Sequence, residues 1–431
     1  MERYGGLGDV HRSGYSVAEN ARRLARYAAV EQHLLHILAG HLQGVPEYEV
    51  KAMLARHLWE DAEHCDTLRK RLPELRGHDR SVEVELAGLL GRFLEEVLRA
   101  QNTIELLAGV YGVVKPALLA AYREHQATTN PLADQPTTRH LRFIIQEEEE
   151  HIAWGRQSLT ELLATEKQQA EVHAWQVHLA AYLAAAGGIA GDQPVPTTEL
   201  PVGRPPFQIC RHSLRDGRFT TTVLKDYGRP VQTVTERLHH MMWVRAVELT
   251  ASESVASLIF EWNDLPWEAY HDLARHCWDE MRHTLMGEAS LEAEGIALTD
   301  LPNWVGYTEH AMQLPPLERY AHLAVYIEMG AMKYPPGARA DYEFARDEAK
   351  HALMALYLDY DWADEVIHAR LGRRWVVKHS CGGDVQAAIA MGEKTAQLRV
   401  AFYERWRDEH NLQPTYETGP GIARKHEKPD P

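Results

Sequence analysis

One eleven-residue stretch occurs twice in the chain, as LARHLWEDAEH at residues 54–64 and as LARHCWDEMRH at residues 273–283. Both copies lie in helical patterns and end in an acid-x-x-His motif, Asp61-x-x-His64 and Glu280-x-x-His283. A carboxylate and an imidazole three positions apart project from the same side of an α-helix, so both can reach one metal ion inside a bundle. The stretch therefore indicates a metal-ligating helix, and its copy indicates an internal duplication.

The length of 431 residues is also that of two domains of roughly 200 residues each. Hydrophobic periodicity at three and four positions predicts helices in both halves, and a Gly- and Pro-rich segment separates them. The expected division is an N-terminal bundle (1–186), a linker (187–232), a C-terminal bundle (233–412) and a loosely ordered tail (413–431).

Composition excludes several classes of protein. Hydrophobic residues make up 45% of the chain and charged residues 25%, and the formal net charge is −16, which argues against a nucleic-acid partner. No apolar run is long enough for a membrane helix and the N-terminus lacks a signal-peptide pattern, so we expect a cytoplasmic protein without a membrane partner. The cysteines are far apart and form no Cys-x-x-Cys pair, which argues against a disulfide framework or a rubredoxin-like iron site.

Each half presents the same order of motifs: a helix with an inward Glu, one with acid-x-x-His, one with Ile-Glu, and one with Glu-x-x-His. Two single carboxylates and two acid-x-x-His motifs form the ligand set of a dinuclear carboxylate site in a four-helix bundle. Carboxylate oxygens with one imidazole per ion suit iron or manganese. On these motifs the chain resembles the ferritin-like superfamily, and the resemblance implies an all-α fold of two tandem ferritin-like four-helix bundles joined by the Pro/Gly-rich segment.

Carried over to the second half, the resemblance implies a complete set of six ligands. Glu248 is an alternative to Glu253 at the first position, and Glu328 is favoured over Glu318 because Ile327-Glu328 matches Ile104-Glu105. The implied ligands are Glu253, Glu280, His283, Glu328, Glu348 and His351.

In the first half the resemblance implies a set that departs from the family pattern, because an Asp stands where the second half has Glu280. An Asp is one methylene shorter, so it either coordinates a single ion without bridging or weakens the site. The second half is therefore the favoured place for chemistry. The implied ligands are Glu31, Asp61, His64, Glu105, Glu148 and His151.

The resemblance implies a dinuclear iron (or Mn/Fe, or Mn) oxidoreductase that activates O2 to oxidise a small organic substrate by hydroxylation, N-oxygenation, desaturation or oxidative cleavage. The electron donor and the substrate are left open, and a homodimer is compatible with such a bundle. Alternatives are an iron-handling or peroxide-scavenging protein of the ferritin or rubrerythrin kind, and a metal-free helical binding module.

Overall fold

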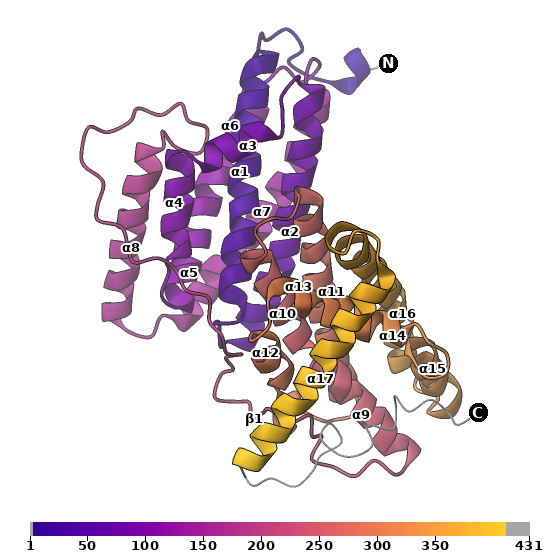
Figure 1. Ribbon diagram of the computed structural model, residues 1–431. Helices are drawn as coiled ribbons and strands as arrows, with labels where there is room; N and C mark the ends of the chain where they lie inside the picture. Colours follow the sequence, from indigo (N-terminus) through magenta and orange to yellow (C-terminus); the bar gives the residue numbers. More distant parts are fainter. Residues whose placement is uncertain (1–2, 411–431) are drawn as a thin grey trace. The chain divides into compact units, whose positions relative to one another are not determined.

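The computed structural model describes residues 3–410, which are mostly helical, with 71% helix and 1% strand (Figure 1). The expected all-α class is therefore confirmed. The tail expected at 413–431 lies outside the described residues.

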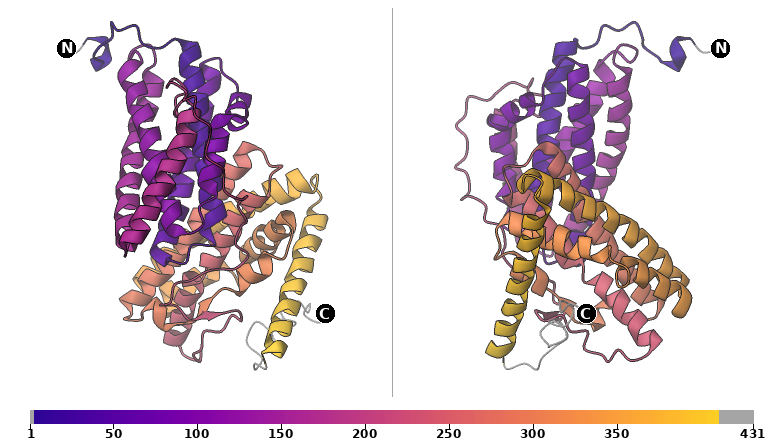
Figure 2. Two further views of the ribbon diagram at one scale, coloured as in Figure 1. Left: turned by 90° about the vertical axis from the view of Figure 1, so that its left-hand side faces the viewer. Right: turned by 45° about the vertical axis from the view of Figure 1, so that its right-hand side comes forward.

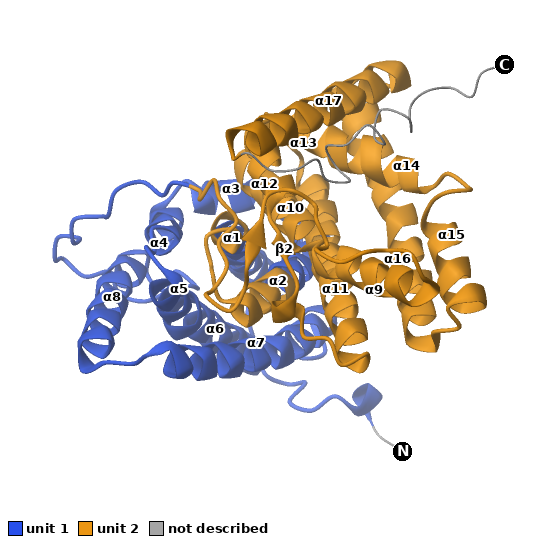
Figure 3. Ribbon diagram, turned by 90° about the horizontal axis from the view of Figure 1, so that it is seen from below, with its two compact units in different colours: residues 1–38, 57–208 blue, residues 39–56, 209–431 orange. Residues whose placement is uncertain are grey.

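The chain divides into two compact units, shown in different colours in Figure 3. Unit 1 comprises residues 1–38 and 57–208, and unit 2 comprises residues 39–56 and 209–431. The Gly- and Pro-rich segment is thus not a separate linker, because its first part packs with unit 1 and its second part with unit 2.

Unit 1 is built on long helices that run alongside one another (Figure 2). Its third long helix combines α5, η2 and α6 and is apolar enough to cross a membrane by composition, but 61% of its most apolar window is buried inside the protein. That burial is typical of a core helix. The elements are α1 (Val17–Leu42), α2 (Tyr48–Glu74), α3 (Arg80–Leu86), α4 (Leu89–Leu98), α5 (Thr103–Gly109), η2 (Val110–Val114), α6 (Lys115–Thr128), α7 (Gln135–Leu162) and α8 (Glu166–Ala185), preceded by the short η1 (Tyr4–Gly6).

Aromatic and thiol contacts hold the long helices of unit 1 together. The Tyr27 ring on α1 meets the Tyr122 ring on α6 edge to face, with centroids 4.9 Å apart. The Cys65 thiol on α2 donates a hydrogen bond to the Ala28 carbonyl on α1. Helix α8 packs on α4 and α5, as expected for an accessory helix outside the central bundle.

Unit 2 is also built mainly of helices, and these have more interruptions. Its first helix breaks between α9 and α10, and a capping box of Thr233 and Glu236 begins α9. The strands β1 and β2 form one short parallel pair. The elements are β1 (Thr221–Thr222), α9 (Val234–Ala246), α10 (Leu249–Glu261), α11 (Trp267–Ala293), η3 (Leu298–Asp300), β2 (Asn303–Trp304), α12 (Gly306–Ala311), α13 (Pro316–Tyr320), η4 (Ala321–Glu328), α14 (Met329–Ala331), α15 (Ala338–Glu343), η5 (Phe344–Glu348), α16 (Ala352–Leu371), η6 (Gly372–Ser380) and α17 (Val385–Glu409).

The third helix of each unit contains a π-helical segment, η2 in unit 1 and η4 in unit 2, and each lies against a glycine of the fourth helix. A Cβ atom on Gly155 would come within 2.2 Å of the Tyr111 ring, and one on Gly372 would come within 2.5 Å of the Ala324 carbonyl oxygen. Such π segments are frequent at functional sites. The two glycines therefore permit close approach at the same level of both units.

We predict that Gly372→Ala destabilises the protein by about 1–3 kcal/mol, because the added methyl group collides with backbone atoms of η4 that cannot move independently. Gly330→Ala is the matched control, since no atom lies within 4 Å of its added Cβ. The midpoint of urea denaturation, followed by circular dichroism, measures the difference. Equal midpoints for the two variants would contradict the close approach.

Candidate metal centre

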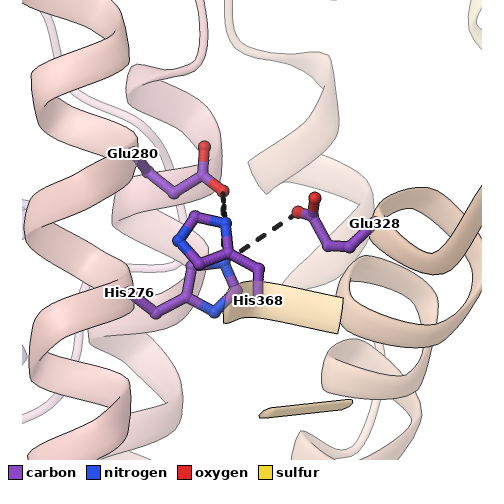
Figure 4. A group of neighbouring side chains, drawn as sticks. All are labelled: His276, Glu280, Glu328 and His368. Carbon is purple, nitrogen blue, oxygen red and sulfur yellow. Dashed lines mark hydrogen bonds and ion pairs between the residues drawn. The ribbon is translucent and has the colours of Figure 1, made fainter. Parts of the chain in front are cut away.

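Acids and histidines from four helical segments of unit 2 converge in its interior. They come from the break between α9 and α10, from α11, from the end of η4 and from α16. Figure 4 shows four of the side chains, with Glu280 and Glu328 pointing toward the stacked rings of His276 and His368. Three overlapping groups of side chains here could hold a metal ion, and together they contain His276, Asp361 and the six residues that we call the unit 2 cluster: Glu248, Glu280, His283, Glu328, Glu365 and His368.

The Glu280 carboxylate lies between two imidazoles. Its Oε1 is 3.7 Å from His368 Nδ1, and its Oε2 is 3.9 Å from His283 Nδ1. Both distances are too long for hydrogen bonds. Two ligand atoms each bound to the same ion at about 2.1 Å are roughly 3.0–4.2 Å apart, which matches the spacing. Glu280 would therefore be able to hold metal ions together with His283 and His368, while its Oε1 also meets His276 Nε2 at 3.1 Å.

Several polar atoms of the cluster are buried without a hydrogen-bond partner. Among the described residues these include Glu248 Oε2, Glu365 Oε2, His283 Nδ1 and both ring nitrogens of His368. Buried polar atoms are nearly always hydrogen-bonded in native proteins. Cations in the cluster would satisfy the two glutamate oxygens and the Nδ1 atoms of His283 and His368, while His368 Nε2 faces outward, so the residues fit a bound metal.

His283 and His368 each have an aspartate beside Nε2, the ring nitrogen that faces away from the cluster. Asp364 Oδ2 is 3.3 Å from His283 Nε2, and Asp279 Oδ2 is 3.5 Å from His368 Nε2. Metal-bound histidines commonly direct their other ring nitrogen to a carboxylate, which fixes the ring and its tautomer. His368 Nδ1 therefore faces Glu280, while His283 Nδ1 faces Asp361 Oδ1 at 3.3 Å, Glu248 Oε2 at 3.6 Å and Glu280 Oε2 at 3.9 Å.

Burial makes the charged form of these acids unfavourable. It raises the pKa of Glu365 to about 7, with the negative charge of Glu280 adding to the effect. Burial also raises the pKa of Glu248 well above its ordinary value, although the positive charge of Arg245, 2.9 Å away, acts to lower that pKa. Metal ligands must be deprotonated, so a bound cation would exchange for protons on these groups.

His276 packs directly on the cluster. Its ring stacks on His368 with centroids 3.8 Å apart, and its Nε2 lies 3.1 Å from Glu280 Oε1. Its Nδ1 meets the Tyr320 hydroxyl at 3.3 Å. These contacts hold His276 beside both Glu280 and Glu328, which is why it belongs to one of the groups able to hold an ion.

A cavity of about 270 Å³ opens beside the unit 2 cluster. Four acids of the cluster form part of its wall, and Trp304, Tyr307, Leu323 and Arg399 contribute to the rest. The volume is close to the lower end of small-molecule sites, roughly 300 Å³. A small organic molecule would therefore fit next to the acids.

Unit 1 contains a related cluster with an internal cation in it. The Lys115 ammonium on α6 lies 2.6 Å from Asp61 Oδ1, 2.7 Å from Glu148 Oε1 and 3.1 Å from His151 Nδ1. Burial acts to lower the pKa of Lys115, but Asp61 and Glu148 raise it above its ordinary value. The unit 1 cluster consists of Glu31, Asp61, His64, Lys115, Glu148 and His151.

The two clusters correspond in their ring geometry. The His57 and His151 centroids are 3.8 Å apart in unit 1, and the His276 and His368 centroids are 3.8 Å apart in unit 2. Outer carboxylates also recur, since Glu60 lies 2.7 Å from His151 Nε2 as Asp279 faces His368. The two copies of the eleven-residue stretch thus have similar side-chain contacts in the two units.

The third helix supplies each cluster with one residue of different charge. Lys115 lies four positions after Tyr111, whose ring contacts Gly155, and Glu328 lies four positions after Ala324, whose carbonyl contacts Gly372. The third helix therefore contributes an amine in unit 1 and a carboxylate in unit 2.

The structure brings together most of the ligands expected from the sequence. In unit 2 it gathers Glu280, His283 and Glu328, and it places Glu248 at the first position, which was the alternative to Glu253. In unit 1 it gathers Glu31, Asp61, His64, Glu148 and His151.

Glu253 is not part of the unit 2 cluster. It lies further along α10, where the buried side chains of Lys51, Ser213 and Arg215 surround its carboxylate. The break between α9 and α10 is the physical reason for this correction, because it places Glu248 rather than Glu253 toward His283.

The expected fourth-helix motif of unit 2, Glu348 and His351, is also corrected. Segment η5 ends at Glu348, which is exposed, and Lys350 has a positive φ of 53°. His351 is the N-cap of α16, where its Nδ1 accepts a hydrogen bond from Met354 N, and its Nε2 lies 3.1 Å from Glu294. The chain is not one continuous helix here, so the two side chains do not share a face.

Glu105 is the third correction. It lies in the first turn of α5, where Gln101 N donates a hydrogen bond to its carboxylate and Arg204 forms an ion pair with it. Its expected place in the unit 1 cluster belongs to Lys115, ten residues further along the same long helix.

Sequence reasoning overlooked Glu365-x-x-His368, although the chain contained two signals for it. Asp61 and Glu148 are separated by 87 positions, Glu280 and Glu365 by 85, and Glu280 and Glu348 by only 68. A glycine also follows four positions after His151 and after His368, as Gly155 and Gly372, whereas Ala355 follows His351. No comparable signal identifies Lys115.

Comparison with known proteins assigns no activity to this arrangement. A family model described as "Protein of unknown function (DUF455)" matches residues 215–409, a segment that contains the whole unit 2 cluster. Comparison with curated proteins finds no match. Comparison with solved structures finds none either.

We predict that Lys115→Met destabilises the protein by about 3–5 kcal/mol, because it leaves the buried carboxylates of Asp61 and Glu148 without their cation. Lys70→Met is the matched control in the same unit, since Lys70 is exposed and pairs with Asp66 at the surface, where ion pairs contribute roughly 0–1 kcal/mol. Urea denaturation of both variants provides the comparison. A Lys115→Met variant as stable as the control would show that the lysine does not neutralise the cluster.

Proposed function

We propose that unit 2 holds a dinuclear metal centre of the ferritin-like kind, bound by the six residues of the unit 2 cluster. The observation that carries the proposal is the placement of Glu280 between the Nδ1 atoms of His283 and His368, at distances suited to shared ions. The paired outer carboxylates of Asp364 and Asp279 support the same assignment. On this proposal the two units are tandem versions of one four-helix bundle.

The donor set favours iron, with Mn/Fe or Mn as alternatives. Four glutamates and two imidazoles supply mostly hard oxygen ligands, which suit iron and manganese. Copper(I) and zinc are often bound by thiolates instead. The cysteine nearest the cluster in sequence, Cys277, is buried and donates to Ser252 instead, with burial raising its pKa to about 12. Sulfur ligation therefore has no part in the proposed site.

The reaction we propose is the oxidation of a small organic substrate with O2, by hydroxylation, N-oxygenation, desaturation or oxidative cleavage. A pair of adjacent redox-active ions, when bound, supplies two electrons for the reduction of O2. The chain's own residues shape the place where the substrate lies. Trp304, Tyr307 and Leu323 offer it an apolar wall, and Arg399 offers a positive charge at the same cavity.

The cavity favours an oxidoreductase over an iron-handling protein, because its wall includes the acids of the cluster as well as apolar side chains. A peroxide scavenger of the rubrerythrin kind would need Cys-x-x-Cys motifs to bind a rubredoxin-like iron, and this sequence has none. A metal-free binding module would leave the ligand atoms of Glu248, Glu365 and His368 buried and unsatisfied.

The metal content of variants tests the assignment of the site. We expect Glu365→Ala and His368→Ala to lose two ions per chain relative to the parent protein after iron-replete expression, because each removes a ligand of the cluster. Glu348→Ala and His351→Ala are matched controls from the competing Glu-x-x-His motif, and we expect them to retain full metal content. Inductively coupled plasma mass spectrometry gives the stoichiometry; loss of metal in the controls alone would reverse the assignment.

Oxygen consumption tests the reaction class. The protein reduced and loaded with ferrous iron is expected to consume O2 repeatedly with an added reductant, while its iron content stays constant. Glu365→Ala is expected to abolish this turnover. Progressive accumulation of ferric iron far beyond the ligand stoichiometry would instead support iron storage and contradict the proposed oxidoreductase.

A further inference from the structure

The side of the unit 1 cluster that faces away from Lys115 has its own set of unsatisfied atoms. Glu31 Oε2, Asp61 Oδ2, His64 Nδ1 and Glu148 Oε2 are all buried and have no hydrogen-bond partner. The four side chains are between 0% and 3% exposed. Polar atoms in such a position ordinarily find a partner, so four at one place indicate a missing ligand.

The same four side chains have the spacing of ligands around one ion. Each of Glu31, Asp61, His64 and Glu148 offers one ligand atom, and these atoms all lie within 4.8 Å of one another. His64 Nδ1 is 3.4 Å from Glu31 Oε1, which accepts from Tyr122, and 3.7 Å from Glu148 Oε1, which accepts from Lys115; both separations exceed a hydrogen bond. They match the roughly 3.0–4.2 Å expected between two ligands of one ion.

Neighbouring groups hold two of these side chains in place by their other atoms. The Tyr122 hydroxyl donates to Glu31 Oε1 at 2.6 Å. Glu147 faces His64 Nε2 at 2.7 Å, as Asp364 faces His283 in unit 2. The free Nδ1 of His64 and the free oxygen of Glu31 are thereby left for a ligand.

Lys115 occupies only the other side of the cluster. Its ammonium contacts Asp61 Oδ1, Glu148 Oε1 and His151 Nδ1, which are the atoms that a second ion would need. A second metal ion at that position would be repelled by the ammonium and would find its ligands already engaged. The geometry therefore permits one ion and excludes a pair.

We propose that unit 1 binds a single divalent metal ion through Glu31, Asp61, His64 and Glu148, with the Lys115 ammonium serving as the second cation. With neutral histidines, three carboxylates and one ammonium leave two negative charges, which one divalent ion balances. Three oxygen donors and one imidazole suit Mn²⁺ or Fe²⁺. A lone ion beside an ammonium lacks a metal partner for a two-electron step, so we assign it a stabilising role in unit 1.

Binding of Mn²⁺ alone to the full chain tests this inference. In a Glu280→Ala/Glu365→Ala background, which removes two ligands of unit 2, we expect one Mn²⁺ per chain and the six-line electron paramagnetic resonance signal of an isolated ion. Adding Glu31→Gln is expected to remove that ion, and adding His64→Gln provides a second variant with the same expectation. Glu149→Gln is the matched control, because Glu149 is exposed and pairs with Arg123 at the surface.

Three outcomes would overturn the proposal. The first is a folded background protein, verified by circular dichroism, that binds no Mn²⁺. The second is a background protein that binds a coupled pair with Lys115 present. The third is an ion that Glu31→Gln and His64→Gln both leave in place. Failure of the proposed unit 2 centre would appear separately, as equal Mn²⁺ content in the parent and background proteins.

Lys115→Glu examines the role of the ammonium in the same background. It replaces the amine by the carboxylate that the third helix contributes in unit 2, so we expect the folded variant to bind two ions with a spin-coupled signal. A folded Lys115→Glu protein that still binds one isolated ion would show that Lys115 does not hold the second position.

Discussion

Neutralisation of buried carboxylates is the constraint on which the interior of both units depends. Each unit gathers several acids away from water, where an uncompensated charge is strongly unfavourable. In unit 1 the ammonium of Lys115 lies within hydrogen-bond distance of Asp61 and Glu148. In unit 2 the third helix adds a further acid, Glu328, and Arg245 pairs with Glu248 at the edge of the cluster, which leaves Glu280, Glu328 and Glu365 without a lysine or arginine partner among the described contacts. The proposed metal ions follow from that imbalance.

The helical framework fixes which residue reaches the centre. A π segment in the third helix lies against a glycine of the fourth helix in both units, and the residue four positions later enters the cluster. Glu60 and Asp279 then orient His151 and His368 by facing the Nε2 atom of each ring. Close backbone approach and a second layer of acids thus position the same inner groups in two bundles whose third-helix residues differ in charge.

The sequence predicted the helical class and most of the acids and histidines that the structure gathers in the two clusters, because acid-x-x-His motifs on periodic helices are local signals. It failed at Glu348 and His351 because that Glu-x-x-His motif is not helical: the backbone leaves the helical conformation at Lys350. It failed at Glu105 because a first-turn acid was better satisfied by Arg204. Lys115 could not be found, since a lysine in an apolar helix carries no pattern that identifies its buried partners.

Helices α2 and α11 each contain two adjacent acids, one facing into the cluster and one facing a histidine from outside it. The order of Asp and Glu is reversed between the two helices. Unit 1 has the longer acid outside and the shorter one inside, Glu60 and Asp61, whereas unit 2 has Asp279 outside and Glu280 inside. The shorter inner acid of unit 1 meets the lysine amine, and the longer inner acid of unit 2 extends between two imidazoles. The length of the inner acid and the identity of the third-helix residue therefore differ together between the two units. The two units thus have different sets of contacts, and converting the contacts of unit 1 into those of unit 2 has to change both positions together.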